Sequence, residues 1–138
     1  LRIEVIELLV RQGVTVICAG GGGIPVIALA DGKHAGVEAV IDKDRSSALL
    51  AAQIGADVFL TLTDVTAVFR DWGTKRQMAI GLLSPAEARG SDFAEGSMRP
   101  KVEAAADFVR SGGKFAGIGL LDDALAVLEG KAGTMIRN

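Results

Sequence analysis

Lysines stand at two places in this sequence where a helix is predicted to begin, and at the first of them the lysine is flanked by aspartates. Lys43 stands between Asp42 and Asp44, and Lys101 follows Pro100. The N-terminus of a helix favours anions, because its first N–H groups are unpaired and the helix dipole is positive there. Cationic groups around an anion suit phosphoryl transfer, in which negative charge spreads over the oxygens of the transferred group. The alternative interpretation is plainer: a solvated turn with a capping aspartate at the first place, and an exposed first-turn lysine at the second.

A block of four glycines is the second candidate for chemistry: Gly20, Gly21, Gly22 and Gly23. Consecutive glycines let the backbone approach a ligand closely, and successive N–H groups can form a nest for an anion. The alternative is a structural tight turn. The block matches neither common nucleotide fingerprint. A Walker A loop needs Ser or Thr after Gly-Lys, and the dinucleotide fingerprint needs a glycine where Pro25 stands.

The third candidate is the run Thr63, Asp64 and Val65, which follows a short apolar segment over residues 57–62. That segment is predicted to be a buried strand. A carboxylate at the end of a buried strand is costly unless it is paired or functional. An Asx-turn cap is the alternative role for Asp64.

Patterns typical of strands and helices alternate along the chain and position these residues. We expect helices over residues 1–11, 44–54, 100–111 and 122–128, strands over 14–18, 57–62, 115–119 and 133–136, and hairpins over 26–40 and 66–81. The last strand is expected at the sheet edge, and residues 90–98 are expected to form a loop. A capping box, Ser84-Pro85-Ala86-Glu87, predicts a further short helix. This alternation predicts an α/β fold with a mostly parallel sheet, whose ligands gather at the carboxyl ends of the strands.

Composition narrows the class of protein. The 138 residues suit one domain, residues 1–138, and 49% are hydrophobic, which is ample for a core. Fifteen basic and seventeen acidic residues give a net charge of −2 without a basic stripe, so nucleic acid is not an expected partner. The single cysteine, Cys18, excludes an internal disulfide and fits a buried strand residue in a reducing cytoplasm. No apolar run is long enough to cross a membrane.

Taken in order, these motifs resemble the C-terminal, nucleotide-binding half of the carbamate kinases, which belong to the amino-acid kinase superfamily. The resemblance covers essentially all 138 residues and rests on the glycine block, the Asp-Lys-Asp run, the Thr-Asp-Val run and the stretch Gly96-Ser97-Met98-Arg99-Pro100-Lys101. It implies a three-layer αβα sandwich, present here in part. It also implies reversible phosphoryl transfer between ATP and carbamate with Mg²⁺, giving ADP and carbamoyl phosphate, and a place in arginine metabolism.

The resemblance assigns roles to particular residues. Lys43 matches a catalytic lysine, Asp44 the aspartate that orients it, and Lys101 a second phosphate-binding lysine. The remaining matches are nucleotide or phosphate contacts: Gly20, Gly21, Gly22, Gly23, Thr63, Asp64, Val65, Met98 and Pro100. No metal ligand is assigned to a protein side chain. The expected partners are small molecules, ATP or ADP and carbamate or carbamoyl phosphate.

The sequence also departs from the family pattern. Arg99 replaces a glycine and places a bulky cation near the expected phosphates, Thr66 and Phe69 replace an aspartate and a tyrosine, and residues 117–120 replace a strand end that contains Thr-Ser. The family's Gly-Gly-Asn motif and carbamate pocket are missing. The chain starts at Leu1 inside a predicted helix, which suggests a fragment. We therefore expect poor turnover by the chain alone, and an exposed sheet edge that favours a homodimer or poor solubility.

Two other functions fit the same residues. The first is a truncated, non-catalytic module that binds ATP or ADP. The second is another amino-acid kinase acting on a carboxylate such as glutamate, against which the Asp-Lys-Asp and Gly-Ser-Met-x-Pro-Lys runs argue.

Overall fold

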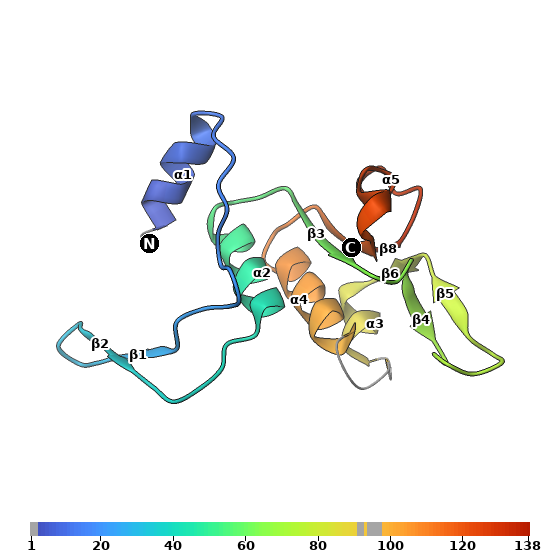
Figure 1. Cartoon of the computed structure of the whole chain (residues 1–138), viewed down its shortest axis with the longest axis horizontal. Helices are drawn as coiled ribbons and strands as arrows, with labels where there is room; N and C mark the ends of the chain where they lie inside the picture. Colours follow the sequence, from blue (N-terminus) through green and yellow to red (C-terminus); the bar gives the residue numbers. More distant parts are fainter. Residues whose placement is uncertain (1–2, 91–92, 94–97) are drawn as a thin grey trace.

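The computed structural model describes residues 3–90, 93 and 98–138, and its centre is a four-stranded sheet (Figure 1). The strand order is β3-β7-β8-β6. The bounds are Val58–Thr63 for β3, Leu82–Leu83 for β6, Phe115–Leu120 for β7 and Thr134–Ile136 for β8. The β3–β7 and β6–β8 pairs are parallel and the β7–β8 pair is antiparallel. The prediction of an α/β fold with a mostly parallel sheet is confirmed.

Helices cover both faces of this sheet, as the three-layer arrangement requires. One face carries α2 (Lys43–Gln53), α3 (Pro85–Gly90) and α4 (Met98–Arg110), and the other carries α5 (Ala124–Leu128), which follows a short 3-10 turn (Leu121–Asp123). Phe59 of β3 meets Phe108 of α4 at a ring-centroid distance of 5.6 Å. The next residue, Leu60, points to the α5 face, because successive side chains of a strand alternate.

The core is built from small and branched side chains. Helix α4 buries the face that its sequence pattern predicts: Val102, Ala105, Ala106, Phe108 and Val109. Each buried Val or Phe contributes about 1.5–3 kcal/mol relative to an exposed position. Alanines allow the helix backbone to lie close to the sheet, so α4 is held in place along its whole length.

The position of the last strand differs from the prediction. Residues 134–136 form β8, but β8 lies inside the sheet between β7 and β6, and not at its edge. The edge position is taken by β6, a two-residue strand that the sequence pattern did not reveal. A strand of two residues is too short to show the alternation of apolar and polar residues by which strands are recognised.

Two local predictions on this side of the molecule are confirmed. A hairpin forms from β4 (Val68–Arg70) and β5 (Met78–Ile80), and Gly73, in the loop that connects them, has φ +75°. The capping box at α3 also forms. The main-chain N–H and the hydroxyl of Ser84 donate to Glu87, which holds the pKa of that carboxyl below its usual value.

The buried hydroxyl of Thr134 fastens the hairpin to the sheet. Its Oγ1 accepts from the Val68 N–H at 2.8 Å and donates to the Ile80 carbonyl. Thr134 is completely buried. These two bonds therefore satisfy main-chain groups of both hairpin strands in the interior.

Residues 3–41, which we call the N-terminal arm, extend outward from the packed body and come close to it where the glycine block meets the start of α2 (Figure 1). The arm contains α1 (Ile3–Arg11) and a hairpin of β1 (Val26–Ala28) and β2 (His34–Gly36), both as predicted. The prediction of a central strand over residues 14–18 is wrong for this structure, because the segment is extended without strand pairing. Cys18 is accordingly only half-buried. A strand needs hydrogen-bonding neighbours, and the described part of the chain supplies none here.

Candidate functional site

The topology brings the charged motifs to one edge of the sheet. Helix α2 leads into β3 and helix α4 leads into β7, and the two strands are parallel. A helix that precedes a parallel strand runs antiparallel to it, so its N-terminus lies near the carboxyl ends of the strands. The N-termini of α2 and α4 and the end of β3 therefore share an edge, and α2 and α4 pack side by side.

Helix α2 begins with a side-chain cap. Asp42 Oδ1 accepts from the main-chain N–H groups of Asp44 at 2.9 Å and Arg45 at 3.0 Å. The cap satisfies two of the free donors of the first turn, and it sets the direction in which the side chains of that turn leave the helix. A capping aspartate was one of the two interpretations of this run, and here the cap and the exposed lysine coexist.

A buried ion pair joins the first turns of α2 and α4. Lys101 Nζ donates to Asp44 Oδ2 at 2.9 Å, and the two side chains are 10% and 12% exposed. Lys43 Nζ lies 3.8 Å from the same oxygen, with 59% of its side chain exposed. One carboxylate thus lies between two ammonium groups, one buried and one free to meet a ligand. The structure brings together the three residues to which the family resemblance gave catalytic roles.

The glycine block lies against the start of α2, and two of its members explain why. A Cβ on Gly22, whose φ is +146°, would lie 2.3 Å from the Ile41 carbonyl oxygen. A Cβ on Gly23 would come within 3.3 Å of Ser46 Oγ. Glycine is therefore required at position 22, whereas a side chain at position 23 would need Ile41 or Ser46 to shift by a few tenths of an ångström. Gly20 and Gly21 meet nothing within 4 Å and leave their backbone open.

The Thr-Asp-Val run lies at the carboxyl end of β3. Thr63 Oγ1 donates to Asp64 Oδ1 at 3.0 Å, and Asp64 is exposed. In the chain as described, no hydrogen bond or ion pair links this run to Lys43, Asp44 or Lys101. The shared sheet edge places the run near the lysines without direct contact.

Helix α4 starts at Met98, two residues before the predicted start. Met98 packs against the core and Pro100 is half-buried in the first turn, where its missing N–H leaves no hydrogen bond unmade. Gly96 and Ser97 of the same motif lie outside the described residues. The packing of Met98 fixes the turn that carries Lys101.

Comparison with known proteins identifies the family. The profile of the amino acid kinase family matches residues 1–117. The chain belongs to the amino acid kinase family.

Individual members of this family are similar to the chain over nearly its whole length. A carbamate kinase of Haemophilus influenzae is 50% identical over 135 residues, which are 98% of this chain and 44% of the relative. A carbamate kinase of Thermoplasma volcanium is 48% identical over 99% of this chain and 46% of the relative. The solved structure of carbamate kinase from Giardia lamblia bound to AMP-PNP superposes with a TM-score of 0.88 at 36% identity, covering 99% of this chain and 49% of that one. The chain spans less than half the length of the curated relatives it matches.

Arg99, which was expected near the phosphates, is paired with a carboxylate of its own helix. Its Nε lies 3.5 Å from Glu103 Oε1, and Arg45 reaches Glu103 Oε2 at 2.8 Å. Residues 99 and 103 share one face of α4, whereas Lys101 is about 200° round the helix. Glu103 thus holds both arginines on the outer face of α4. The i,i+4 spacing of Arg99 and Glu103 was visible in the sequence, but the link to Arg45 was not.

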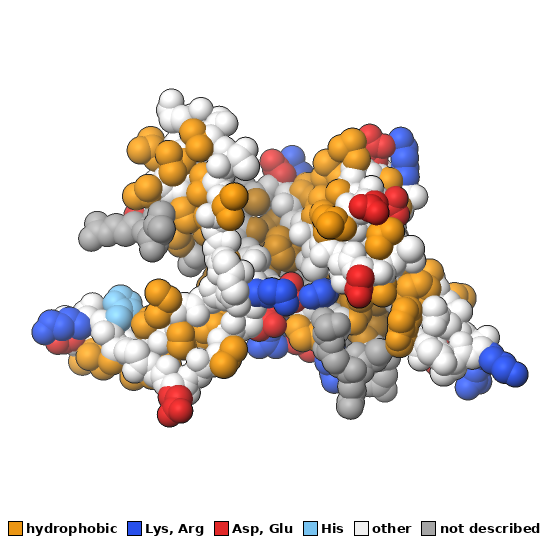
Figure 2. All heavy atoms as spheres, viewed as in Figure 1, with side chains coloured by type: hydrophobic (Ala, Val, Ile, Leu, Met, Phe, Trp, Pro, Cys, Tyr) orange, Lys and Arg blue, Asp and Glu red, His pale blue; other side chains and the backbone are white. Residues whose placement is uncertain are grey.

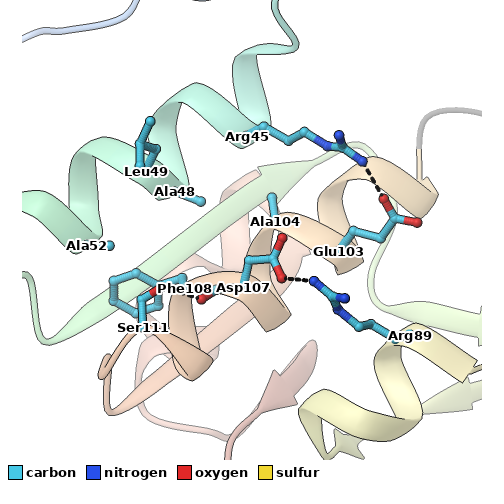
Figure 3. A pocket seen from close by; sticks show the side chains of 10 residues that line it. All are labelled: Arg45, Ala48, Leu49, Ala52, Arg89, Glu103, Ala104, Asp107, Phe108 and Ser111. Atoms are coloured by element: carbon cyan, nitrogen blue, oxygen red, sulfur yellow. Dashed lines mark hydrogen bonds and ion pairs between the residues drawn. The ribbon is translucent and has the colours of Figure 1, made fainter.

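A hollow of about 530 Å³ lies between α2, α4 and α3, beside this charged group (Figure 3). Ion pairs of Arg45 with Glu103 and of Arg89 with Asp107 border it, and Phe108 and small side chains line it. Its lining includes neither the lysines nor Asp44. In this amino acid kinase family member the hollow is therefore separate from the candidate phosphate site.

The glycines of β7 explain another departure from the family pattern. A Cβ on Gly117 would lie 2.7 Å from Val127 Cγ1, and one on Gly119 would lie 2.6 Å from Val127 Cγ2. Helix α5 packs directly on the strand where the pattern has Thr-Ser. The absence of side chains at these positions makes this close packing possible.

Proposed function

We propose that this chain is the nucleotide-binding half of a carbamate kinase, which transfers a phosphoryl group reversibly between ATP and carbamate. The observation that carries the proposal is the convergence of Lys43 and Lys101 on Asp44 at the N-termini of two helices. Two observations on relatives support it: identity near 50% to carbamate kinases, and the match to a carbamate kinase bound to AMP-PNP.

Each residue has a distinct task in this mechanism. The exposed ammonium of Lys43 approaches the oxygens of the transferring phosphoryl group. Lys101 adds positive charge from its buried position on the protein side of Asp44. Asp44 holds the two ammonium groups near each other and lowers their mutual repulsion. The open backbone of Gly20 and Gly21 offers N–H donors to the same oxygens. Preorganised charge of this kind stabilises the transition state without a nucleophilic side chain.

Mg²⁺ is expected to arrive with the nucleotide, because it binds phosphate oxygens and keeps much of its own water. Across the residues described here, no three His, Cys, Asp or Glu side chains gather to hold a metal ion. We therefore assign no step of the mechanism to a metal held by the protein. The same residues include no helix that is both long and apolar enough to cross a membrane.

A second candidate is a non-catalytic module that binds ATP or ADP. The chain spans less than half the length of the relatives that it matches. The two candidates differ in turnover but share the phosphate site, so binding is the first property to test.

The test is calorimetric titration with MgADP of the wild-type chain, Lys43→Ala and Lys114→Ala. Lys43 is largely exposed, so its removal leaves the fold intact, and losing one charge-assisted contact to phosphate weakens binding about 10- to 100-fold. Lys114 is also an exposed lysine but lies at the opposite end of the sheet, in a surface pair with Asp57, and its substitution leaves affinity unchanged. Equal affinity for all three proteins, or no binding by a folded wild-type chain, refutes the proposal.

A further inference from the structure

The hollow between α2, α4 and α3 has one charged end and one apolar end. Its volume of about 530 Å³ lies within the range of pockets that take small organic ligands. Figure 3 shows charged side chains from all three helices toward one end, and the ring of Phe108 with Ala52 beside it at the other. Such a division matches a ligand that carries one charged group on an apolar body.

The apolar end is formed by both long helices. Phe108 is 1% exposed and Ala48 is 3% exposed, so these two side chains belong to a closed floor. Leu49, on the wall of the hollow, is 61% exposed. Arg45 and Ala52 lie about 10 Å apart along the axis of α2, which sets the length of ligand that the hollow can hold. A body of that length would remove the Leu49 side chain from water, which favours binding.

Arg45 is the arginine of the hollow that can bind an anion at the least cost. Its Nη2 donates to Glu103 Oε2, and among the described residues this is the one partner of its guanidinium, whose other N–H donors are available. Glu103 also has Arg99 at 3.5 Å, so Arg45 can turn to a ligand without leaving that carboxylate unpaired. Asp107, by contrast, pairs with Arg89 alone in the described part of the chain.

We propose that this hollow binds a small monocarboxylate with a straight apolar chain. The carboxylate pairs with the guanidinium of Arg45 at the charged end, and the chain lies on the floor at Phe108 and covers Leu49. One negative charge is favoured, because the arginines at positions 45, 89 and 99 pair with two carboxylates, those of residues 103 and 107. The lining of the hollow shares no residue with the candidate phosphate site, so the proposal holds whether or not the chain binds nucleotide.

Octanoate is the probe, with octanamide as its uncharged match and acetate as its match without the apolar chain. Each compound is titrated into the 138-residue chain and followed in amide NMR spectra. We expect saturable binding of octanoate that shifts the amide signals of residues 45–52 and 104–111. Octanamide should bind about 10- to 100-fold more weakly, because it lacks the charge that pairs with Arg45. Acetate should bind at least about 100-fold more weakly, because it buries no apolar chain.

Variants distinguish the hollow from other surfaces that can hold an apolar anion. Figure 2 shows apolar side chains exposed over α1 and the β1–β2 hairpin, and Lys43 is an exposed cation. Arg45→Gln should weaken octanoate binding about 10- to 100-fold, whereas Lys43→Ala should leave it unchanged. Arg110→Gln, which changes an exposed arginine of α4 outside the lining of the hollow, should also leave it unchanged.

The apolar wall has a matched pair of variants of its own. Leu49→Asp places a carboxylate beside the apolar chain and should weaken octanoate binding at least about 10-fold. Leu125→Asp makes the same change on α5, where Leu125 is 70% exposed, and should leave the affinity unchanged. All the substituted side chains are exposed, so the circular dichroism of each variant should match that of wild type.

Three results would overturn the proposal: no saturable binding of octanoate, equal affinity for octanoate and octanamide, or equal affinity of wild type and Arg45→Gln. Loss of octanoate binding in Lys43→Ala with full binding in Arg45→Gln would place the carboxylate at the candidate phosphate site, and it would overturn the proposal as well.

Discussion

Replacing Lys101 by Met removes one charge of the buried pair with Asp44 and keeps the shape of the aliphatic stem. At 2.9 Å and an effective dielectric constant of about 20, the attraction between the two charges is about 6 kcal/mol. Burial of each ion opposes this by several kcal/mol. The pair thus contributes little net stability, but removal of one member leaves the other buried without compensation.

Lys101→Met and Asp44→Leu are therefore expected to lower the free energy of unfolding by different amounts. After Lys101→Met, Asp44 still has Lys43 at 3.8 Å, so we expect a loss of about 3 kcal/mol. After Asp44→Leu, no other carboxylate of the described chain pairs with Lys101, and we expect about 5 kcal/mol. The double substitution Asp44→Leu with Lys101→Met leaves no buried charge, and its stability is expected within about 1 kcal/mol of wild type.

Urea unfolding followed by far-ultraviolet circular dichroism measures these free energies. Lys114→Met is the matched control, because Lys114 also lies 2.9 Å from a carboxylate, that of Asp57, but both side chains are mostly exposed. An exposed pair contributes at most about 1 kcal/mol. If Lys101→Met costs no more than Lys114→Met, water screens the Lys101 pair and the argument from burial fails. Loss of MgADP binding in a stable double variant would separate the proposed phosphate-binding role of the pair from its structural one.

Three further predictions concern other parts of the structure. Gly22→Ala introduces a Cβ 2.3 Å from a main-chain oxygen and should lower both the unfolding midpoint and MgADP affinity, whereas Gly21→Ala, with open space around it, should leave the unfolding midpoint unchanged. Thr134→Val leaves a buried N–H of β4 and a buried carbonyl of β5 unpaired, and should cost about 2–4 kcal/mol in urea unfolding; a loss below about 1 kcal/mol would mean that water replaces the hydroxyl. The pKa of Glu87 is lowered from 4.5 by the Ser84 hydrogen bonds, so its stabilisation is present above pH 4.5 and is lost as pH falls through the lower, folded value. Carboxyl titration by NMR should find this lowered pKa in wild type and a higher one in Ser84→Ala.

Structural features that depend on a few neighbouring residues could be predicted from the sequence. The box at Ser84 and Glu87 formed because each group bonds a neighbour three residues away. The buried face of α4 followed from spacing alone, since three or four residues make one helical turn. The candidate site was predicted in part for the same reason: a lysine at a helix start is visible in a run of three residues.

Contacts between distant parts of the chain required the tertiary structure. Lys101 and Asp44 are 57 residues apart, and Arg45 and Glu103 are 58 apart, so no local pattern pairs them. The position of β8 inside the sheet depended on β6, whose two residues have no pattern of their own.

Residues 14–18 show most clearly where prediction from the sequence fails. Their composition predicted a strand, and the prediction is wrong for this structure, because a strand exists only when another segment completes its hydrogen bonds. The sequence by itself determined where helices start and which helix face is apolar, and it named the residues that are candidates to hold a phosphate. The tertiary structure decided which charges meet and which strands pair, because those interactions depend on partners that chain topology, and not local composition, brings within reach.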